Sequence, residues 1–218
     1  MKQYETVIFD LDGTLLDTLE DLKEAVNYAL SVCDMPKRSL EEVRRFVGNG
    51  IRRLMQRAVV DGEDNPQFEH AFAEFQSYYK LHCNDNTKPY PGVMELLAKL
   101  KEKGYHLAIV SNKADFAVKE LQEIYFKGAV EAAIGEREGV ARKPAKDTVM
   151  QALHEMGVPA EGAIYVGDSD VDIMTAANAG IPCISVTWGF RDREFLKEHG
   201  ATRFADNTGE LIRLIEEM

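Results

Sequence analysis

Short apolar runs alternate with amphipathic segments over most of the chain. Several runs are apolar at consecutive positions, which is typical of strands covered on both faces of a parallel sheet. Phe116, Leu121 and Ile124 follow the second run at roughly helical spacing. The alternation of strand and helix predicts an α/β fold with an open, doubly wound parallel sheet. The five predicted strands are Tyr4–Asp10, Tyr105–Ser111, Val130–Gly135, Gly162–Asp168 and Pro182–Thr187.

The region between Leu16 and Asn86 has helical patterns and no convincing strand. Its two apolar stripes are Leu19, Leu22, Val26 and Leu30, and Phe68, Phe72, Phe75 and Tyr79. Aromatic residues at helical spacing could line a cofactor, but they more often pack in a core, which is our interpretation here. The region ends in the turn-rich stretch CNDNTKPYPG. We therefore expect an α/β core at 1–15 and 88–218, with an inserted helical domain at 16–87.

The composition is that of an ordinary globular protein, with 45% hydrophobic and 29% charged residues among 218. No apolar run approaches the ~18 residues of a membrane span, and the first residues lack the features of a secretory signal. Cys33, Cys83 and Cys183 are odd in number and far apart, which fits a reducing compartment and argues against a disulfide framework or a structural zinc site. We expect a cytoplasmic protein that does not bind membranes.

Charge is distributed unevenly along the chain. The net charge of −11 makes nucleic acid a poor partner. Residues 37–57 nevertheless contain seven basic and only two acidic side chains. This basic segment could be the solvated face of a helix, or it could draw a small anion toward a cleft. Both interpretations stay open at this point.

Polar residues follow four consecutive predicted strands. They are Asp10 and Asp12 after the first; Ser111 and Asn112 after the second; Arg142, Lys143 and Lys146 after the third; and Asp168, Ser169, Asp170 and Asp172 after the fourth. Singly, each set could be helix caps, a turn or a surface lysine. Ligands in open α/β sheets bind outside the carboxyl ends of the strands. Four coincidences along that one edge therefore indicate a common site.

This set of residues suits metal-assisted phosphoryl transfer. The carboxylates of Asp10 and Asp12 would lie close together, and each would oppose the ionisation of the other unless a positive charge lies nearby. A divalent cation between Asp10 and Asp168 would supply that charge. Oxygen-only ligands indicate Mg²⁺. An aspartate can attack phosphorus, a second carboxylate can act as general acid and base, and a lysine with a hydroxyl can hold the non-bridging oxygens.

The segments DLDGTLLDT, SN, KP and GDSDVD, in this order and spacing, resemble the four motifs of the haloacid dehalogenase superfamily of phosphatases and phosphomutases. The resemblance spans the whole chain and is specific as a set. It implies that Asp10 is the nucleophile and Asp12 the general acid and base. It also implies that Ser111 binds the phosphoryl group and that Lys143 neutralises its charge.

The same resemblance implies the Mg²⁺ ligands. These would be Asp10, the backbone carbonyl of Asp12, and Asp168, with Asp172 assisting through water or by orienting Lys143. The dehalogenases themselves lack the second aspartate of the first motif. Asp12 therefore favours phosphate chemistry over halide displacement.

The insert resembles the small helical cap of this superfamily, and FVGNGIRRLMQRA, PYPGV and SNK resemble its phosphoglycolate phosphatase branch. The expected substrate-binding residues are Thr14, Asn112, Gly48, Asn49, Gly50 and Arg52. Glycines would let the backbone approach a small ligand closely, although a plain helix–helix turn explains VGNG equally well. After RKP the branch usually has a second proline, where this chain has Ala145, Lys146 and Asp147.

The predicted function is a Mg²⁺-dependent phosphatase that acts on a small phosphorylated metabolite, with phosphoglycolate favoured. Alternatives within the same chemistry are a pyrophosphatase and a sugar-phosphate phosphatase. From another reaction class, a phosphomutase would share Asp10 and Asp12 but return the phosphoryl group to the substrate instead of to water. A non-enzymatic scaffold is disfavoured because every catalytic position is filled. We expect a monomer or a homodimer.

Overall fold

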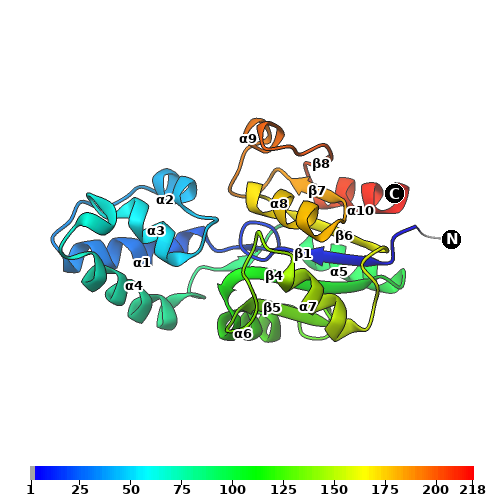
Figure 1. Cartoon of the computed structure of the whole chain (residues 1–218), viewed down its shortest axis with the longest axis horizontal. Coiled ribbons are helices and arrows are strands. Elements are labelled where there is room, and N and C mark those ends of the chain that lie inside the picture. The colour runs from blue at the N-terminus through cyan, green and yellow to red at the C-terminus, as the bar shows by residue number, and fades with distance from the viewer. Residues whose placement is uncertain (1–2) are drawn as a thin grey trace. The chain divides into compact units, whose positions relative to one another are not determined.

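The computed structural model describes residues 3–218. It divides the chain into two compact units, here named the core unit (residues 1–16 and 89–218) and the helical unit (residues 17–88) (Figure 1). The two short strands β2 (Leu16–Asp17) and β3 (Lys88–Pro89) pair where the chain passes between the units.

The core unit is built on a six-stranded sheet in the order β5-β4-β1-β6-β7-β8. All of its strand pairs are parallel, as predicted. The chain runs outward from β1 through β4 to β5, then returns to the other side of β1 with β6, so the sheet's switch point lies at β1. The strands are β1 (Thr6–Phe9), β4 (His106–Ala114), β5 (Ala132–Glu136), β6 (Ala163–Gly167), β7 (Cys183–Val186) and β8 (Phe204–Ala205).

Helices cover both faces of this sheet (Figure 1). Side chains alternate along β1, so Val7 and Phe9 enter one apolar cluster while Ile8 enters the other. The first cluster includes side chains of α5 (Val93–Glu102), α6 (Asp115–Tyr125) and α10 (Thr208–Glu217), and the second includes those of α7 (Asp147–Met156) and α8 (Asp170–Ala179). A further helix, α9, spans Arg193–Glu198. Burial on both faces explains why the strands are apolar at consecutive positions.

Helix α6 buries a different face from the one the sequence pattern indicated. Phe116 and Ile124 are 60% and 52% exposed, whereas Ala117, Val118 and Leu121 are buried. Residues 116, 120 and 124 lie on one line of the helix, and the buried residues form the neighbouring line. The prediction from the large apolar side chains Phe116 and Ile124 is therefore wrong about which face of α6 is buried.

The helical unit contains α1 (Leu19–Val32), α2 (Leu40–Phe46), α3 (Ile51–Ala58), a short 3₁₀ helix (Gly62–Asp64) and α4 (Phe68–His82). The stripe of α1 is buried at all four predicted positions, and Phe68, Phe75 and Tyr79 are buried on α4. These aromatic residues therefore pack in a core, as interpreted from their spacing. Within residues 3–218, no helix is both long and apolar enough to cross a membrane.

Candidate active site

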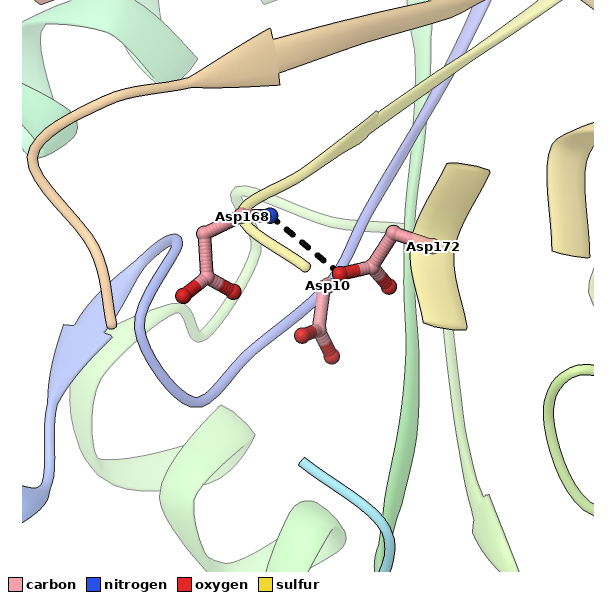
Figure 2. Close-up of side chains that lie close together, drawn as sticks. All are labelled: Asp10, Asp168 and Asp172. Atoms are coloured by element: carbon pink, nitrogen blue, oxygen red, sulfur yellow. Dashed lines mark hydrogen bonds between the residues drawn. The ribbon is translucent and has the colours of Figure 1, made fainter. Parts of the chain in front are cut away.

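Three buried carboxylates gather at the carboxyl ends of β1 and β6, beside the switch point of the sheet. Asp10 directly follows β1 and Asp168 directly follows β6, while Asp172 lies in the first turn of α8. Figure 2 shows their side chains converging, and one oxygen of each lies within 4.8 Å of the others. The Asp10 backbone N–H donates to the Val166 carbonyl at 2.9 Å, which continues the strand pairing up to the site.

The loop after β1 is shaped around Asp168. The turn is closed by backbone N–H groups that donate to the Leu11 carbonyl, so it does not depend on the aspartate side chains. Gly13 has a φ of +88°, and a Cβ there would overlap Asp168 Oδ2. The Thr14 hydroxyl donates to Asp168 Oδ1 at 3.3 Å, and the Phe190 N–H donates to Oδ2 at 2.6 Å. Thr14 therefore lies against a carboxylate of the site, and its predicted contact with substrate stays a prediction.

Lys143 is a buried cation beside two of the three clustered carboxylates. Its side chain is 3% exposed, and Nζ lies 2.8 Å from Asp10 Oδ1 and 2.8 Å from Asp172 Oδ1. Nζ also donates to the Tyr165 hydroxyl at 3.1 Å and to the Val110 carbonyl at 3.3 Å. Three ammonium protons thus face four acceptors, which holds Nζ beside Asp10.

Asp172 connects the lysine to the Asp168 loop. Its Oδ1 accepts from Lys143 and from the Tyr165 hydroxyl, at 2.8 and 3.1 Å. Its Oδ2 accepts from the Asp168 N–H and from the N–H and hydroxyl of Ser169, at 3.2, 3.0 and 2.6 Å. Of the two roles considered for Asp172, orienting Lys143 is the one this geometry supports. Ser169 is the N-cap residue of α8, so the helix cap considered in the sequence analysis accounts for this serine.

The electrostatics of the site are those of crowded, buried acids. Burial raises the pKa of Asp10 well above its ordinary value, and repulsion from Asp172 adds to this, while attraction to Lys143 lowers it in part. Burial, with repulsion from Asp172, raises the pKa of Asp168 to about 7. Burial opposes the ammonium form of Lys143, but attraction to Asp10 and Asp172 outweighs it and raises its pKa. One lysine does not balance three carboxylates.

These residues fit a magnesium ion. The donors are carboxylate oxygens, which Mg²⁺ prefers, and they converge closely enough to share a cation. Burial raises the pKa of both Asp10 and Asp168, so a divalent charge between them would favour their ionised forms.

The predicted phosphoryl-binding residues come from the end of β4. Ser111 is 2% exposed, and its hydroxyl accepts from the Lys113 N–H at 3.1 Å. It does not cap α6, whose N-cap residue is Ala114. The Asn112 side chain donates to the Lys143 carbonyl at 3.1 Å, and its Oδ1 is buried without a hydrogen-bond partner. Asn112 thus ties the end of β4 to the lysine loop.

The expected binding residues of the helical unit are held by contacts within that unit. Gly48, Asn49 and Gly50 lie between α2 and α3, and the two glycines have φ of +113° and +81°. Asn49 Oδ1 accepts from Arg57 at 2.9 Å. Arg52 pairs with two glutamates, and its guanidinium lies over two aromatic rings of α4. A substrate contact for these residues stays a prediction.

Two residues of the site were not assigned a role from sequence. Tyr165 lies within an apolar strand pattern in the sequence. A buried tyrosine hydroxyl needs a partner, so its position in a buried strand is a signal for polar neighbours. Lys113 was quoted only within SNK. Its side chain is 5% exposed, and Nζ donates to Asp12 Oδ1 at 2.9 Å. A buried lysine requires a compensating charge, but sequence alone does not identify which.

Comparison with known proteins places these features in a family. The family model described as haloacid dehalogenase-like hydrolase matches residues 7–186. The chain is 33% identical over 212 residues to phosphoglycolate phosphatase 1 of Pseudomonas aeruginosa, covering 94% of this chain and 78% of that protein. It is 35% identical over 191 residues to the phosphoglycolate phosphatase of Mesorhizobium japonicum, covering 86% and 84%. A crystal structure assigned as a phosphoglycolate phosphatase of Lactobacillus delbrueckii subsp. bulgaricus has a TM-score of 0.93 and 35% identity, covering 100% of both chains.

Proposed function

The chain belongs to the haloacid dehalogenase-like hydrolases and is a phosphatase with Mg²⁺ as its cofactor, and we propose that its substrate is phosphoglycolate. The substrate proposal is supported by relatives of that name at 33% and 35% identity. The observation that carries the mechanism is the buried cluster in which Lys143 Nζ lies 2.8 Å from Asp10 beside two further aspartates.

The proposed nucleophile is Asp10. A carboxylate oxygen of Asp10 attacks phosphorus, an Asp–O–P bond forms, and the bond from phosphorus to the ester oxygen breaks. Asp12, two residues further along the loop, donates a proton to the departing oxygen. Asp12 then accepts a proton from water as the water attacks phosphorus, and the Asp–O–P bond breaks. Inorganic phosphate and the original carboxylate of Asp10 result.

The remaining residues of the site are proposed to orient the phosphoryl group and to neutralise its negative charge. Lys143 and Ser111 are proposed to hold the non-bridging oxygens, where charge is spread in the transition state. Asp10, the Asp12 carbonyl and Asp168 would hold Mg²⁺, with Asp172 orienting Lys143 as its hydrogen bonds support. The ion supplies positive charge against the phosphoryl oxygens when bound.

Phosphate release is the measurement that tests this proposal. The panel contains phosphoglycolate, pyrophosphate, several sugar phosphates and a hexose 1-phosphate, each with Mg²⁺ and with a chelator. We expect Mg²⁺-dependent release with the highest kcat/KM for phosphoglycolate. Preference for pyrophosphate or a sugar phosphate would replace the substrate while keeping the mechanism. Isomerisation of the hexose phosphate without phosphate release would indicate a phosphomutase instead.

A further inference from the structure

Lys113 is a second buried ammonium group at the site, and the mechanism above does not use it. It lies near the end of β4, its side chain is 5% exposed, and Nζ donates to Asp12 Oδ1 at 2.9 Å. Lys143, in contrast, lies against Asp10 and Asp172. Lys143 therefore lies beside the proposed nucleophile, and Lys113 lies beside the proposed general acid.

Asp12 marks where the leaving group must lie. A general acid has to come within hydrogen-bond reach, about 2.6–3.2 Å, of the ester oxygen that it protonates. The Lys113 ammonium is one hydrogen bond from Asp12, which puts it within reach of the leaving group that Asp12 protonates. The Lys113 N–H also donates to the Ser111 hydroxyl at 3.1 Å, so a single turn positions a phosphoryl-binding group and this ammonium together.

We propose that Lys113 binds an anionic group on the leaving group, one carbon from the ester oxygen, and thereby makes the enzyme selective for small carboxylated phosphomonoesters. This inference rests on the proposed function. In phosphoglycolate a single CH₂ separates the ester oxygen from the carboxylate. With this short spacing, the ester oxygen can accept a hydrogen bond from Asp12 while the carboxylate accepts one from the neighbouring Lys113. Burial strengthens this pairing, because solvent screens it less.

Ethyl phosphate is the matched probe, since a methyl group replaces the carboxylate one carbon from the same ester oxygen. We expect Lys113→Met, which keeps the aliphatic chain and removes the charge, to lower kcat/KM for phosphoglycolate roughly 10- to 100-fold, mainly through KM. Its kcat/KM for ethyl phosphate should fall by a smaller factor, the part that comes from the lost contact with Asp12, so the preference for phosphoglycolate over ethyl phosphate should fall about tenfold. Lys119→Met, at an exposed position in the following helix, should change neither value.

The ratio of the two kcat/KM values, measured on one preparation, does not depend on the fraction of folded protein. Lys113→Arg keeps the positive charge and should recover part of the preference for phosphoglycolate. An equal loss on both substrates in Lys113→Met would overturn the proposal, because it would show that Lys113 only positions Asp12. Failure of the proposed function would appear earlier, as a wild-type enzyme that shows no preference for phosphoglycolate over ethyl phosphate.

Discussion

Asp21 of the helical unit and Asp10 of the core unit are both buried aspartates, but their surroundings differ. The two oxygens of Asp21 accept from the backbone N–H groups of Asn86 and Thr87 and from their side chains, at 2.7 to 2.9 Å. Asp10 instead faces two further carboxylates and one lysine. Asp21 is a satisfied carboxylate that ties α1 to the end of the same unit. Burial alone therefore does not mark a reactive acid; the surrounding donors and charges do.

The charged pairs of the two units differ in the same way. Arg52, from the basic segment, pairs at the surface with Glu63 and Glu69, and such exposed pairs contribute little to stability. The pairs of Lys143 and Lys113 are buried and join segments far apart in the sequence. The buried charged pairs accordingly lie in the core unit, around the switch point of its sheet.

Asp10→Asn should have the largest effect on activity. It removes the nucleophile while keeping the shape of the side chain, and we expect kcat for phosphoglycolate to fall at least about 10⁴-fold. Steady-state phosphate release measures this, with a circular dichroism melt to confirm folding. Asp170→Asn, in the adjacent first turn of α8, is the matched control and should keep kcat within about twofold. Comparable losses in both variants would contradict the assignment.

Lys143→Met should lower both activity and stability. It leaves Asp10 and Asp172 buried without their cation, which costs about 3–5 kcal/mol of unfolding free energy, and kcat/KM should fall roughly 10²–10³-fold. Urea unfolding and phosphate release measure the two effects. Lys146→Met, exposed on the same loop, provides the comparison and should show neither. A loss below tenfold in Lys143→Met would mean that this lysine is not part of the reaction.

Mg²⁺ should stabilise the folded protein more at high pH than at low pH. The folded-state pKa of Asp168, about 7, lies above its unfolded value, so the metal-free fold binds an extra proton between these values and loses stability as pH rises through about 7. Mg²⁺ requires the ionised carboxylates. At about pH 8, excess Mg²⁺ should raise Tm by about 5–10 °C, and at about pH 5 by much less. Asp168→Asn should abolish the difference, while a pH-independent shift would locate the ion elsewhere.

Asp21→Ala should affect stability and leave the chemistry unchanged. Its removal leaves donors of Asn86 and Thr87 without their acceptor, and we expect a loss of about 2–3 kcal/mol in unfolding free energy. Glu20→Ala, which removes only a surface pair with Lys23, should cost less than about 1 kcal/mol. Per folded molecule, kcat should stay near the wild-type value in both. A selective fall in kcat for Asp21→Ala would assign that carboxylate a functional role.

The sequence was sufficient for the sheet and for the edge at which polar residues gather, because both rest on strong local patterns. Buried parallel strands are continuously apolar, and polar residues that interrupt them at their carboxyl ends meet at one place. The two-residue strand β8 was too short to leave such a pattern. The exposed face of α6 was misassigned because large apolar residues also occur on surfaces.

The partners of each charged group could not be predicted from sequence. Tyr165 and Phe190 hold the site through contacts that depend on the three-dimensional packing of β6 and the loop after β7. The pairing of Lys113 with Asp12 joins positions 101 residues apart. Spacing within a motif carries no information about such contacts, so only the structure shows that Lys113 pairs with Asp12.

The most direct test of the central claim is chemical trapping of the covalent intermediate. Wild-type enzyme is mixed with Mg²⁺ and phosphoglycolate, quenched during turnover with borohydride, which reduces an acyl phosphate to an alcohol, and analysed by peptide mass spectrometry. Our account predicts reduction at Asp10 alone, and only when substrate and Mg²⁺ are both present. Reduction at another carboxylate, or none during demonstrated turnover, would contradict Asp10 as the nucleophile.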